Sequence, residues 1–512
     1  MLTFVVRRLL ATVLVVLAAS FIVYNLTANS GDPLADLKAS SSANRQERID
    51  ARTEQLKLDE AVPVRYVYWL GGAAKCVIGQ CDLGDSFTRG DQPVTDALGS
   101  AVGSTLQLIT AATILAIVFG LSVGMITAIR QYSGFDYVVT FITFILYSLP
   151  IFWVAVLLKE YGAIRFNEFL SAPDIPWWLV LLIGLGSGVI WSSIIGGSIK
   201  RRLIAFAGSA VITAGLLGTL IATGWFERPT IGIPGILITG AAIVVVVVLL
   251  STGLQNRRAL ISSGIVVVVL GIAQIPLQYL FFYKPEWWVI PLVIAIGLGL
   301  GFLSGWLFGK DDKRQLARTA AIVGGLTSLL LIVDRVLLVF PDYENRIPLK
   351  NGVIATIGSQ TPGLQGDMWF QMLDSFTHLL LPTIALTLIS FAAYTRYARS
   401  SLLEVMNQDY VRTARAKGLT ERTVIMRHAF RNAMIPIATI ISFDIGALIG
   451  GAIITEQIFA WQGMGYLFNE GLGHTDVNIV MGVFLVTGVV AVLFNLIADL
   501  VYAALDPRIR VA

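Results

Sequence analysis

The chain has 512 residues, of which 56% are hydrophobic and only 14% are charged. Soluble domains carry about 25% charged residues, so this composition, with a mean hydropathy of +0.76, excludes an ordinary water-soluble protein. The net charge of +4 at pH 7 is small for such a length and gives no reason to expect a nucleic-acid partner.

Long apolar runs recur along most of the sequence. A hydrocarbon layer about 30 Å thick is crossed by about 20 apolar residues in a helix, and twelve runs have about that length. The first run follows Arg7 and Arg8 and lacks a small-x-small cleavage site, so we interpret it as a retained anchor rather than a signal peptide. The expected fold is an all-α integral membrane protein with about 12 transmembrane helices. The predicted spans are 9–27, 103–128, 138–158, 176–198, 203–224, 233–254, 259–282, 287–308, 319–340, 376–395, 434–455 and 479–502.

The basic residues predict how these spans are oriented. Cytoplasmic loops of membrane proteins are enriched in Lys and Arg. With the N-terminus inside, 22 of the 37 Lys and Arg residues fall in cytoplasmic segments, and the short outer loops hold only 6. The sequence therefore predicts that both termini are cytoplasmic, that the long loop 28–102 is extracellular, and that the loop 396–433 is cytoplasmic.

Four charged residues, Asp334, Arg335, Asp444 and Asp499, lie inside predicted spans, where a charge is costly and normally faces protein or water. Asp334 and Arg335 are neighbours near the outer end of one span, and we expect them to form a structural pair. Asp444 lies in the eleventh span, and it either lines a pathway or is satisfied by a neighbouring subunit.

The only two cysteines, Cys76 and Cys81, both fall in the loop predicted to be extracellular. An even number of cysteines outside the cell favours a disulfide, and Gly79 permits the tight turn that so short a loop requires. Two unpaired thiols are the alternative.

The cytoplasmic loop has the punctuation of a helical hairpin. The stretch from Leu402 to Lys417 predicts a helix that ends at Gly418, a residue suited to the left-handed position after a helix. Thr420 is a plausible N-cap for a second helix that begins with Glu421. A rigid knob of this kind is suited to docking another protein, and an amphipathic linker lying on lipid is the alternative. The candidate docking residues are Glu404, Asp409, Tyr410, Arg412, Ala414, Ala416, Lys417, Gly418 and Leu419.

These residues, with Ile425, His428, Asn432 and Pro436, resemble the coupling loop of ABC importer permeases. Six further motifs, spread in order along the chain, are similar to the oligopeptide/dipeptide/nickel branch of that family. They are Phe4-Val5-Val6-Arg7-Arg8-Leu9-Leu10, Asn29-Ser30-Gly31-Asp32-Pro33, Asp82-Leu83-Gly84-Asp85-Ser86-Phe87, Ser148-Leu149-Pro150-Ile151-Phe152-Trp153, His378-Leu379-Leu380-Leu381-Pro382 and Asp506-Pro507-Arg508. Gln462 and Asn478 depart from the pattern, since the family commonly has proline at both positions.

The resemblance implies a six-helix type I importer core interrupted by six further helices. The expected regions are an N-terminal anchor helix (1–27), an extracellular loop domain (28–102), core helices 2–3 (103–165), an inserted six-helix membrane region (166–349) and core helices 4–6 with the coupling loop (350–512). The resemblance further implies that Glu456, Trp461 and Gly463 lie at the outer gate. The implied partners are a second homologous permease, two ABC ATPase subunits and an extracellular substrate-binding protein, and the implied location is the bacterial cell membrane.

The chain itself lacks the motifs of an enzyme. The nearest approach to a phosphate-binding loop, Gly305 to Asp311, has the wrong spacing and ends in Asp. The three histidines, at 378, 428 and 474, have no second ligand at metal-binding spacing, so we expect neither a metal site nor a cofactor in this chain. ATP and Mg²⁺ would then be used by the partner ATPases, and peptides are the expected cargo. The rival hypotheses are an ion- or proton-coupled secondary transporter of twelve spans and a polytopic scaffold.

Overall fold

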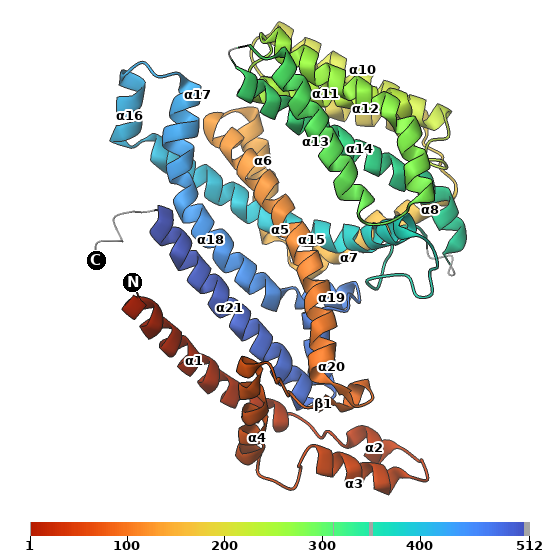
Figure 1. The fold of residues 1–512 in the computed structure, drawn as a ribbon, viewed down its shortest axis with the longest axis vertical. Coiled ribbons are helices and arrows are strands. Elements are labelled where there is room, and N and C mark those ends of the chain that lie inside the picture. The colour runs from red at the N-terminus through yellow and green to blue at the C-terminus, as the bar shows by residue number, and fades with distance from the viewer. Residues whose placement is uncertain (1, 311, 348–351, 506–512) are drawn as a thin grey trace. The chain divides into compact units, whose positions relative to one another are not determined.

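The computed structural model describes residues 2–310, 312–347 and 352–505, and almost all of its regular structure is helical (Figure 1). The chain divides into two compact units. Unit 1 comprises residues 1–160, 356–359 and 379–512, and unit 2 comprises residues 161–355 and 360–378. Two elements cross the boundary, the π-helix η3 (Leu158–Ile164) and the long helix α15 (Met368–Met406).

Unit 1 contains both ends of the chain. Its other helices are α1 (Leu2–Ala28), α2 (Ala35–Ala39), α3 (Arg45–Gln55), α4 (Val62–Ala74), η1 (Lys75–Ile78), η2 (Phe87–Arg89), α5 (Val94–Ile129), α6 (Gly134–Ser148), α7 (Ile151–Leu157), α16 (Asp409–Ala416), α17 (Glu421–Thr423), η4 (Val424–Ala429), α18 (Phe430–Gly451), α19 (Ile453–Ile458), α20 (Met464–Gly473) and α21 (Val477–Leu505). Two short strands, β1 (Asp85–Ser86) and β2 (Gln92–Pro93), pair antiparallel.

Unit 2 is a bundle of apolar helices. It contains α8 (Arg165–Ser171), α9 (Trp177–Ile195), α10 (Ile199–Ala222), α11 (Gly232–Ser251), α12 (Arg257–Tyr283), α13 (Val289–Phe308) and α14 (Lys313–Arg346). α9 and α10 pack against each other, whereas α11 to α14 form a four-helix group.

Within the described residues, nine helices are long and apolar enough to cross a membrane, or ten if one bent pair is a single span. Each of the twelve predicted runs is helical along most of its length. The all-helical membrane fold predicted from the sequence is therefore confirmed, whereas the count of twelve spans stays a prediction.

The predicted span 138–158 is not one straight helix. The chain bends by 104° between α6 and the helical segment that starts at Ile151. Leu149 has extended backbone angles (φ −80°, ψ 131°), because a residue before proline is held out of the helical region and Pro150 has no N–H to donate. The segment is thus a broken span or a re-entrant loop, and the expectation of a continuous helix was wrong.

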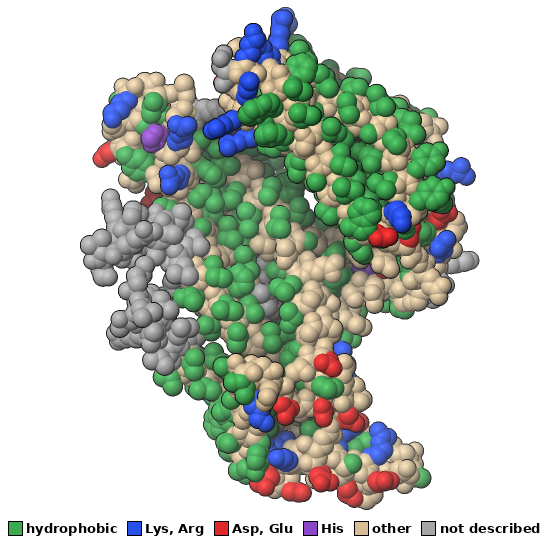
Figure 2. Space-filling model, viewed as in Figure 1, with side chains coloured by type: hydrophobic (Ala, Val, Ile, Leu, Met, Phe, Trp, Pro, Cys, Tyr) green, Lys and Arg blue, Asp and Glu red, His purple; other side chains and the backbone are tan. Residues whose placement is uncertain are grey.

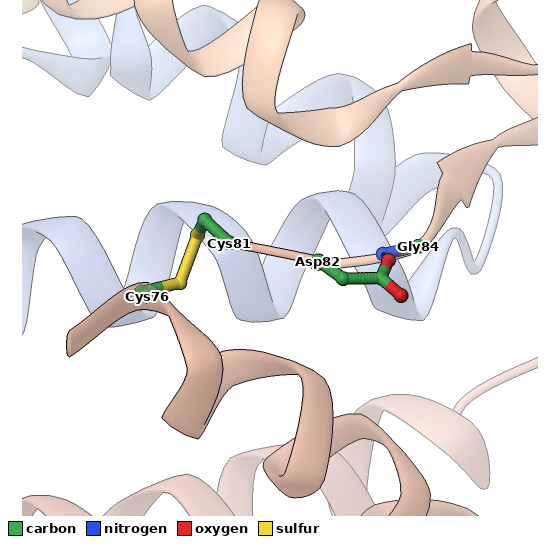
Figure 3. Close-up of a disulfide and its surroundings, with 4 residues drawn as sticks. All are labelled: Cys76, Cys81, Asp82 and Gly84. Carbon is green, nitrogen blue, oxygen red and sulfur yellow. Dashed lines mark hydrogen bonds between the residues drawn. A yellow bond between two sulfur atoms is a disulfide. The ribbon is translucent and has the colours of Figure 1, made fainter. Parts of the chain in front are cut away.

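The loop predicted to be extracellular folds onto α1 and α21. Tyr66 and Trp69 of α4 are buried with Tyr24 of α1 in the main core of unit 1, and the Tyr66 hydroxyl lies 2.8 Å from Ser20 Oγ. Cys76 and Cys81 form a disulfide directly after α4 (Figure 3). The loop is therefore a packed part of unit 1.

Asp334 is the polar centre of unit 2. Its fully buried carboxylate accepts hydrogen bonds from Thr230 Oγ1 (2.9 Å) and from the Ile231 N–H (2.7 Å) and Gly232 N–H (3.1 Å) at the start of α11. The Gln274 and Gln278 amides on α12 donate to its other oxygen. The Arg335 guanidinium instead faces the Trp369 ring, 6.0 Å from its centroid. Asp334 is thus satisfied by α11 and α12, and the predicted pairing with Arg335 does not describe how it is held.

α13 and α14 approach closely through glycines. Gly297, Gly301 and Gly305 are buried and recur every four residues on the face of α13 that packs on α14. A Cβ at Gly301 would overlap the backbone of Ala320, whereas a Cβ at Gly299, on the exposed side, would meet nothing within 4 Å. This Gly-x-x-x-Gly spacing is typical of helix contacts in membranes, where small residues allow backbones to touch.

Gly301→Ala should therefore destabilise the protein by about 1–3 kcal/mol, the usual cost of overpacking. Gly299→Ala is the matched control. It makes the same change of helix propensity two residues away, on the exposed side of α13, and should have little effect. Thermal unfolding of the detergent-purified protein measures both. Equal unfolding temperatures for the two variants would contradict the packing argument.

Candidate functional site

The hairpin predicted at the cytoplasmic loop begins with a break that the sequence interpretation lacked. α15 ends at Met406, and the N–H groups of Asn407 and Gln408 bond to Glu404 and Val405 carbonyls in a tight turn. α16 then starts at Asp409 and runs to Ala416. The predicted single helix from Leu402 to Lys417 is wrong, because the turn at Asn407 and Gln408 separates the end of α15 from α16.

The second half of the hairpin follows the prediction. Gly418 has a left-handed φ of +74°, and its N–H bonds to the Arg415 carbonyl at 2.9 Å. The Thr420 side chain caps the next helix by accepting from the Thr423 N–H. Arg415 and Glu421 form an exposed ion pair at 2.8 Å across the turn, which stabilises it only weakly.

A small apolar core holds α16 in place. Val411 and Ala414 are buried against Val424, with Val405 packed beside them. Ala414 therefore packs inside the hairpin and is 6% exposed, so its part in docking, which stays a prediction, would be to support the exposed residues from within. The remaining candidate docking residues are exposed, namely Glu404, Asp409, Tyr410, Arg412, Ala416, Lys417, Gly418 and Leu419.

The helices that carry the hairpin are tied to unit 1 by polar contacts. Arg399 of α15 binds both carboxylate oxygens of Asp136, at 2.8 and 3.0 Å, and Asp136 is 2% exposed at the start of α6. Two residues further along α15, Ser401 Oγ donates to the Ala433 carbonyl of α18 at 2.9 Å. A bidentate Arg–carboxylate pair fixes both distance and orientation, so the hairpin is joined to a braced pair of helices. The sequence analysis named neither Asp136 nor Arg399.

Asp444 lies on α18 inside unit 1 and is half buried. It lies near the hydroxyl of Tyr394 on α15, a side chain that is fully buried, but no hydrogen bond of ordinary geometry joins the two groups. The carboxylate thus faces protein on this side, as expected for a charge inside a membrane helix.

Glu456 joins three elements of unit 1. One carboxylate oxygen accepts from Thr105 Oγ1 of α5 at 2.7 Å, and the other accepts from the N–H groups of Gly465 (2.7 Å) and Tyr466 (3.0 Å) at the start of α20. The side chain is 0% exposed. Burial raises the pKa of the Glu456 carboxyl above its ordinary value, and these hydrogen bonds oppose that rise. Glu456 therefore caps α20 and attaches it to α5.

Trp461 and Gly463 belong to the same cluster. The Trp461 indole N–H donates to the Ser104 carbonyl at 3.1 Å, and the ring is 1% exposed. A Cβ at Gly463 would overlap Glu456 and Thr105. The three residues assigned to an outer gate thus come together, but as a closed, buried joint, and Asp444 lies apart from them on α18.

A second buried joint escaped the sequence analysis. Asp476, directly before α21, accepts from Ser86 Oγ at 2.8 Å and Thr88 Oγ1 at 3.0 Å, and also from the Ile479 N–H of α21. Its side chain is fully buried. Asn478, one of the two positions noted above as departures from the family pattern, donates to the Asp85 carbonyl at 3.0 Å. An Asp three residues before an apolar run is the N-cap signal that would have identified it.

Within the residues that the structure describes, no three His, Cys, Asp or Glu side chains come together as a metal site. The arrangement is that of a multi-pass membrane protein with a capped helical hairpin at the end of α15, the longest helix among the described residues. Two family models match the chain. "Binding-protein-dependent transport system inner membrane component" matches residues 259–511, and the corresponding N-terminal model matches residues 1–109. Together they cover more than half of the sequence, and the chain belongs to this family of inner-membrane transport components.

Curated relatives carry names from peptide transport. The chain is 43% identical over 155 residues to the oligopeptide transport system permease protein OppB of Mycobacterium tuberculosis, covering 30% of this chain and 48% of that protein. It is 45% identical over 141 residues to the oligopeptide permease AppB of Bacillus subtilis (28% and 45%), and 46% identical over 138 residues to the dipeptide permease DppB of Escherichia coli (27% and 41%). The aligned part thus spans about half the length of these relatives or less.

The raised pKa of Glu456 predicts a pH-dependent difference in stability. Stability from such a group is fully present below the ordinary glutamate pKa of about 4.3 and is lost as pH rises through the higher folded-state pKa. The side chain introduced by Glu456→Gln cannot ionise. The unfolding temperature of the variant should therefore rise relative to that of the wild type as pH increases from about 4.3 to the higher folded-state pKa. Thermal unfolding at a series of pH values measures the difference. A difference independent of pH, or one that moves toward the wild type, would contradict the prediction.

Proposed function

We propose that this chain is the permease subunit of an ATP-driven peptide importer of the oligopeptide or dipeptide class. It forms part of the translocation pathway and is coupled to a separate ATPase. The observation that carries the proposal is the hairpin α16–Gly418–α17, a rigid knob at the end of two membrane helices. The names of the relatives support peptides as the cargo.

The hairpin is suited to transmit a mechanical step. Its exposed side carries Tyr410, Arg412, Lys417 and Leu419, a mixture of aromatic, apolar and cationic groups that fits a groove on a partner protein. Its inner side is fixed by Val411 and Val424, and α15 is braced at Arg399. When the partner moves the knob, α15 and α18 move with it. ATP-driven closure of two ATPases would then switch the pathway between inward-open and outward-open states.

The proposed topology has twelve spans with both termini in the cytoplasm. It places the hairpin inside, where an ATPase can reach it, and the disulfide-bonded loop outside. Residues 166–349 form an inserted six-helix region, and its even number of spans returns the core to the same side of the membrane. The family match that begins at residue 259 includes part of this region.

The complete importer contains further subunits. Each permease has one hairpin, so two ATPases that bind ATP and Mg²⁺ would require a second homologous permease. An extracellular binding protein completes the proposed complex, in keeping with the family description. Asp444 is the proposed pathway residue. The joint formed by Glu456, Trp461 and Gly463 is proposed to support the outer gate from within.

Gly418→Val should reduce ATP-driven peptide uptake by about tenfold or more. The left-handed backbone costs a residue with a Cβ about 1–2 kcal/mol, and a β-branched side chain makes this worse. A Cβ at Gly418 would meet no atom within 4 Å beyond its chain neighbours, so the loss would come from the backbone of the turn and not from a clash. Uptake into proteoliposomes that contain the permease pair, ATPases and binding protein measures the effect.

Gly418→Asn is the matched control, because asparagine tolerates the left-handed conformation and should keep most of the uptake. Unchanged uptake in Gly418→Val would refute the coupling role. Uptake by the chain alone, driven by an ion gradient without ATPases, would instead establish a secondary transporter.

A further inference from the structure

A basic pocket lies at one end of the helices of unit 2. It forms where the turn between α11 and α12 meets the turn between α13 and α14, and its volume is about 350 Å³. Lys and Arg side chains gather at this end of unit 2 (Figure 2). The pocket belongs entirely to unit 2 and contains none of the residues of the coupling hairpin.

The pocket is electropositive because of its side chains. Arg257, Arg258 and Lys310 line it and are exposed, and Asp312 is the one carboxylate among the lining residues that the structure describes. The N-termini of α12 and α14 open onto it, but α11 and α13 end at the same two turns, so the helix dipoles largely cancel there. The side-chain amides of Gln255 and Asn256 provide neutral donors in the same place. A ligand with several anionic oxygens is therefore favoured.

Beside the charged groups, the last turn of α13 exposes large apolar side chains. Trp306 is 43% exposed, Leu307 69% and Phe308 41%, and all three precede Lys310 by only a few residues. A cationic pocket that borders an apolar membrane-facing helix fits a ligand that is anionic at one end and hydrocarbon at the other. A small soluble anion would use only the first half of this surface.

We propose that this pocket binds the phosphate headgroup of an anionic phospholipid. Arg257 and Arg258 would contact the phosphate oxygens with their guanidinium groups, and Lys310 would add a third positive charge. One acyl chain would lie along Phe302 and Trp306, which stack on one face of α13. Basic pockets between transmembrane helices are suited to such headgroups, because each cation near the membrane surface contributes to binding. The proposal does not depend on which solute the chain transports.

The test compares two triple variants of the full-length chain in vesicles that contain phosphatidylglycerol and phosphatidylcholine. Arg257→Gln, Arg258→Gln and Lys310→Gln remove the pocket charges. Lys200→Gln, Arg201→Gln and Arg202→Gln remove the same charge from exposed positions in the first turn of α10, outside the pocket lining. The protein is extracted in mild detergent, and native mass spectrometry counts the retained lipids. If the pocket variant does not extract as folded protein, Lys310→Gln alone replaces it.

We expect the wild type and the α10 variant to retain phosphatidylglycerol in preference to phosphatidylcholine. The pocket variant should lose that preference by about tenfold or more, given about 1 kcal/mol for each cation removed. Equal retention in the wild type and the pocket variant would overturn the proposal. An equal loss in both triple variants would also overturn it, because net charge alone would then attract the lipid. Displacement of the lipid by millimolar inorganic phosphate would show a phosphate site instead and would also overturn it.

Discussion

Inside a hydrocarbon layer no water is present to pair with a backbone N–H or C=O, and this constraint shapes every part of the molecule. Helices satisfy it along their length, which is why almost all of the described regular structure is helical. It is not satisfied at helix ends, where the first N–H groups lack partners inside the helix. The positions where helices begin are therefore where polar side chains are needed most.

Buried carboxylates meet that need in both units. Glu456 accepts from the first N–H groups of α20, and Asp476 accepts from the Ile479 N–H of α21. Asp334 does the same for α11, with two amides of α12 as further donors. Each carboxylate also binds a side chain from another part of its unit, so capping a helix and joining two segments are done by the same group. Removing one of these carboxylates would leave several donors unpaired at once, which is costly in a buried site.

This arrangement explains what could be predicted from the sequence and what could not. Apolar runs report where a helix can be long enough to cross a membrane, and most of each predicted run is helical in the structure. An apolar run does not show whether the helix axis continues in one direction. The bend at Leu149 and Pro150 was therefore missed, although the proline signal was present. Gly418 and Thr420 were recognised because their conformation follows from local chemistry. The burial of Ala414 and Glu456 depends on Val424 and Thr105, residues distant or unremarkable in the sequence, so no local pattern could have revealed it.

The same constraint bears on how a signal at the hairpin reaches the membrane. A helix whose ends are tied by carboxylates cannot slide without breaking several hydrogen bonds, but it can tilt as a body about those ties. α15 has such a tie at Arg399, close to the hairpin, and Ser401 links it to α18 two residues later. In the proposed coupling, a force on α16 would therefore be carried to two membrane helices together and not absorbed by a flexible linker. The turn at Asn407 and Gln408 would set the angle at which that force enters α15, which would give the break in the predicted helix a mechanical role.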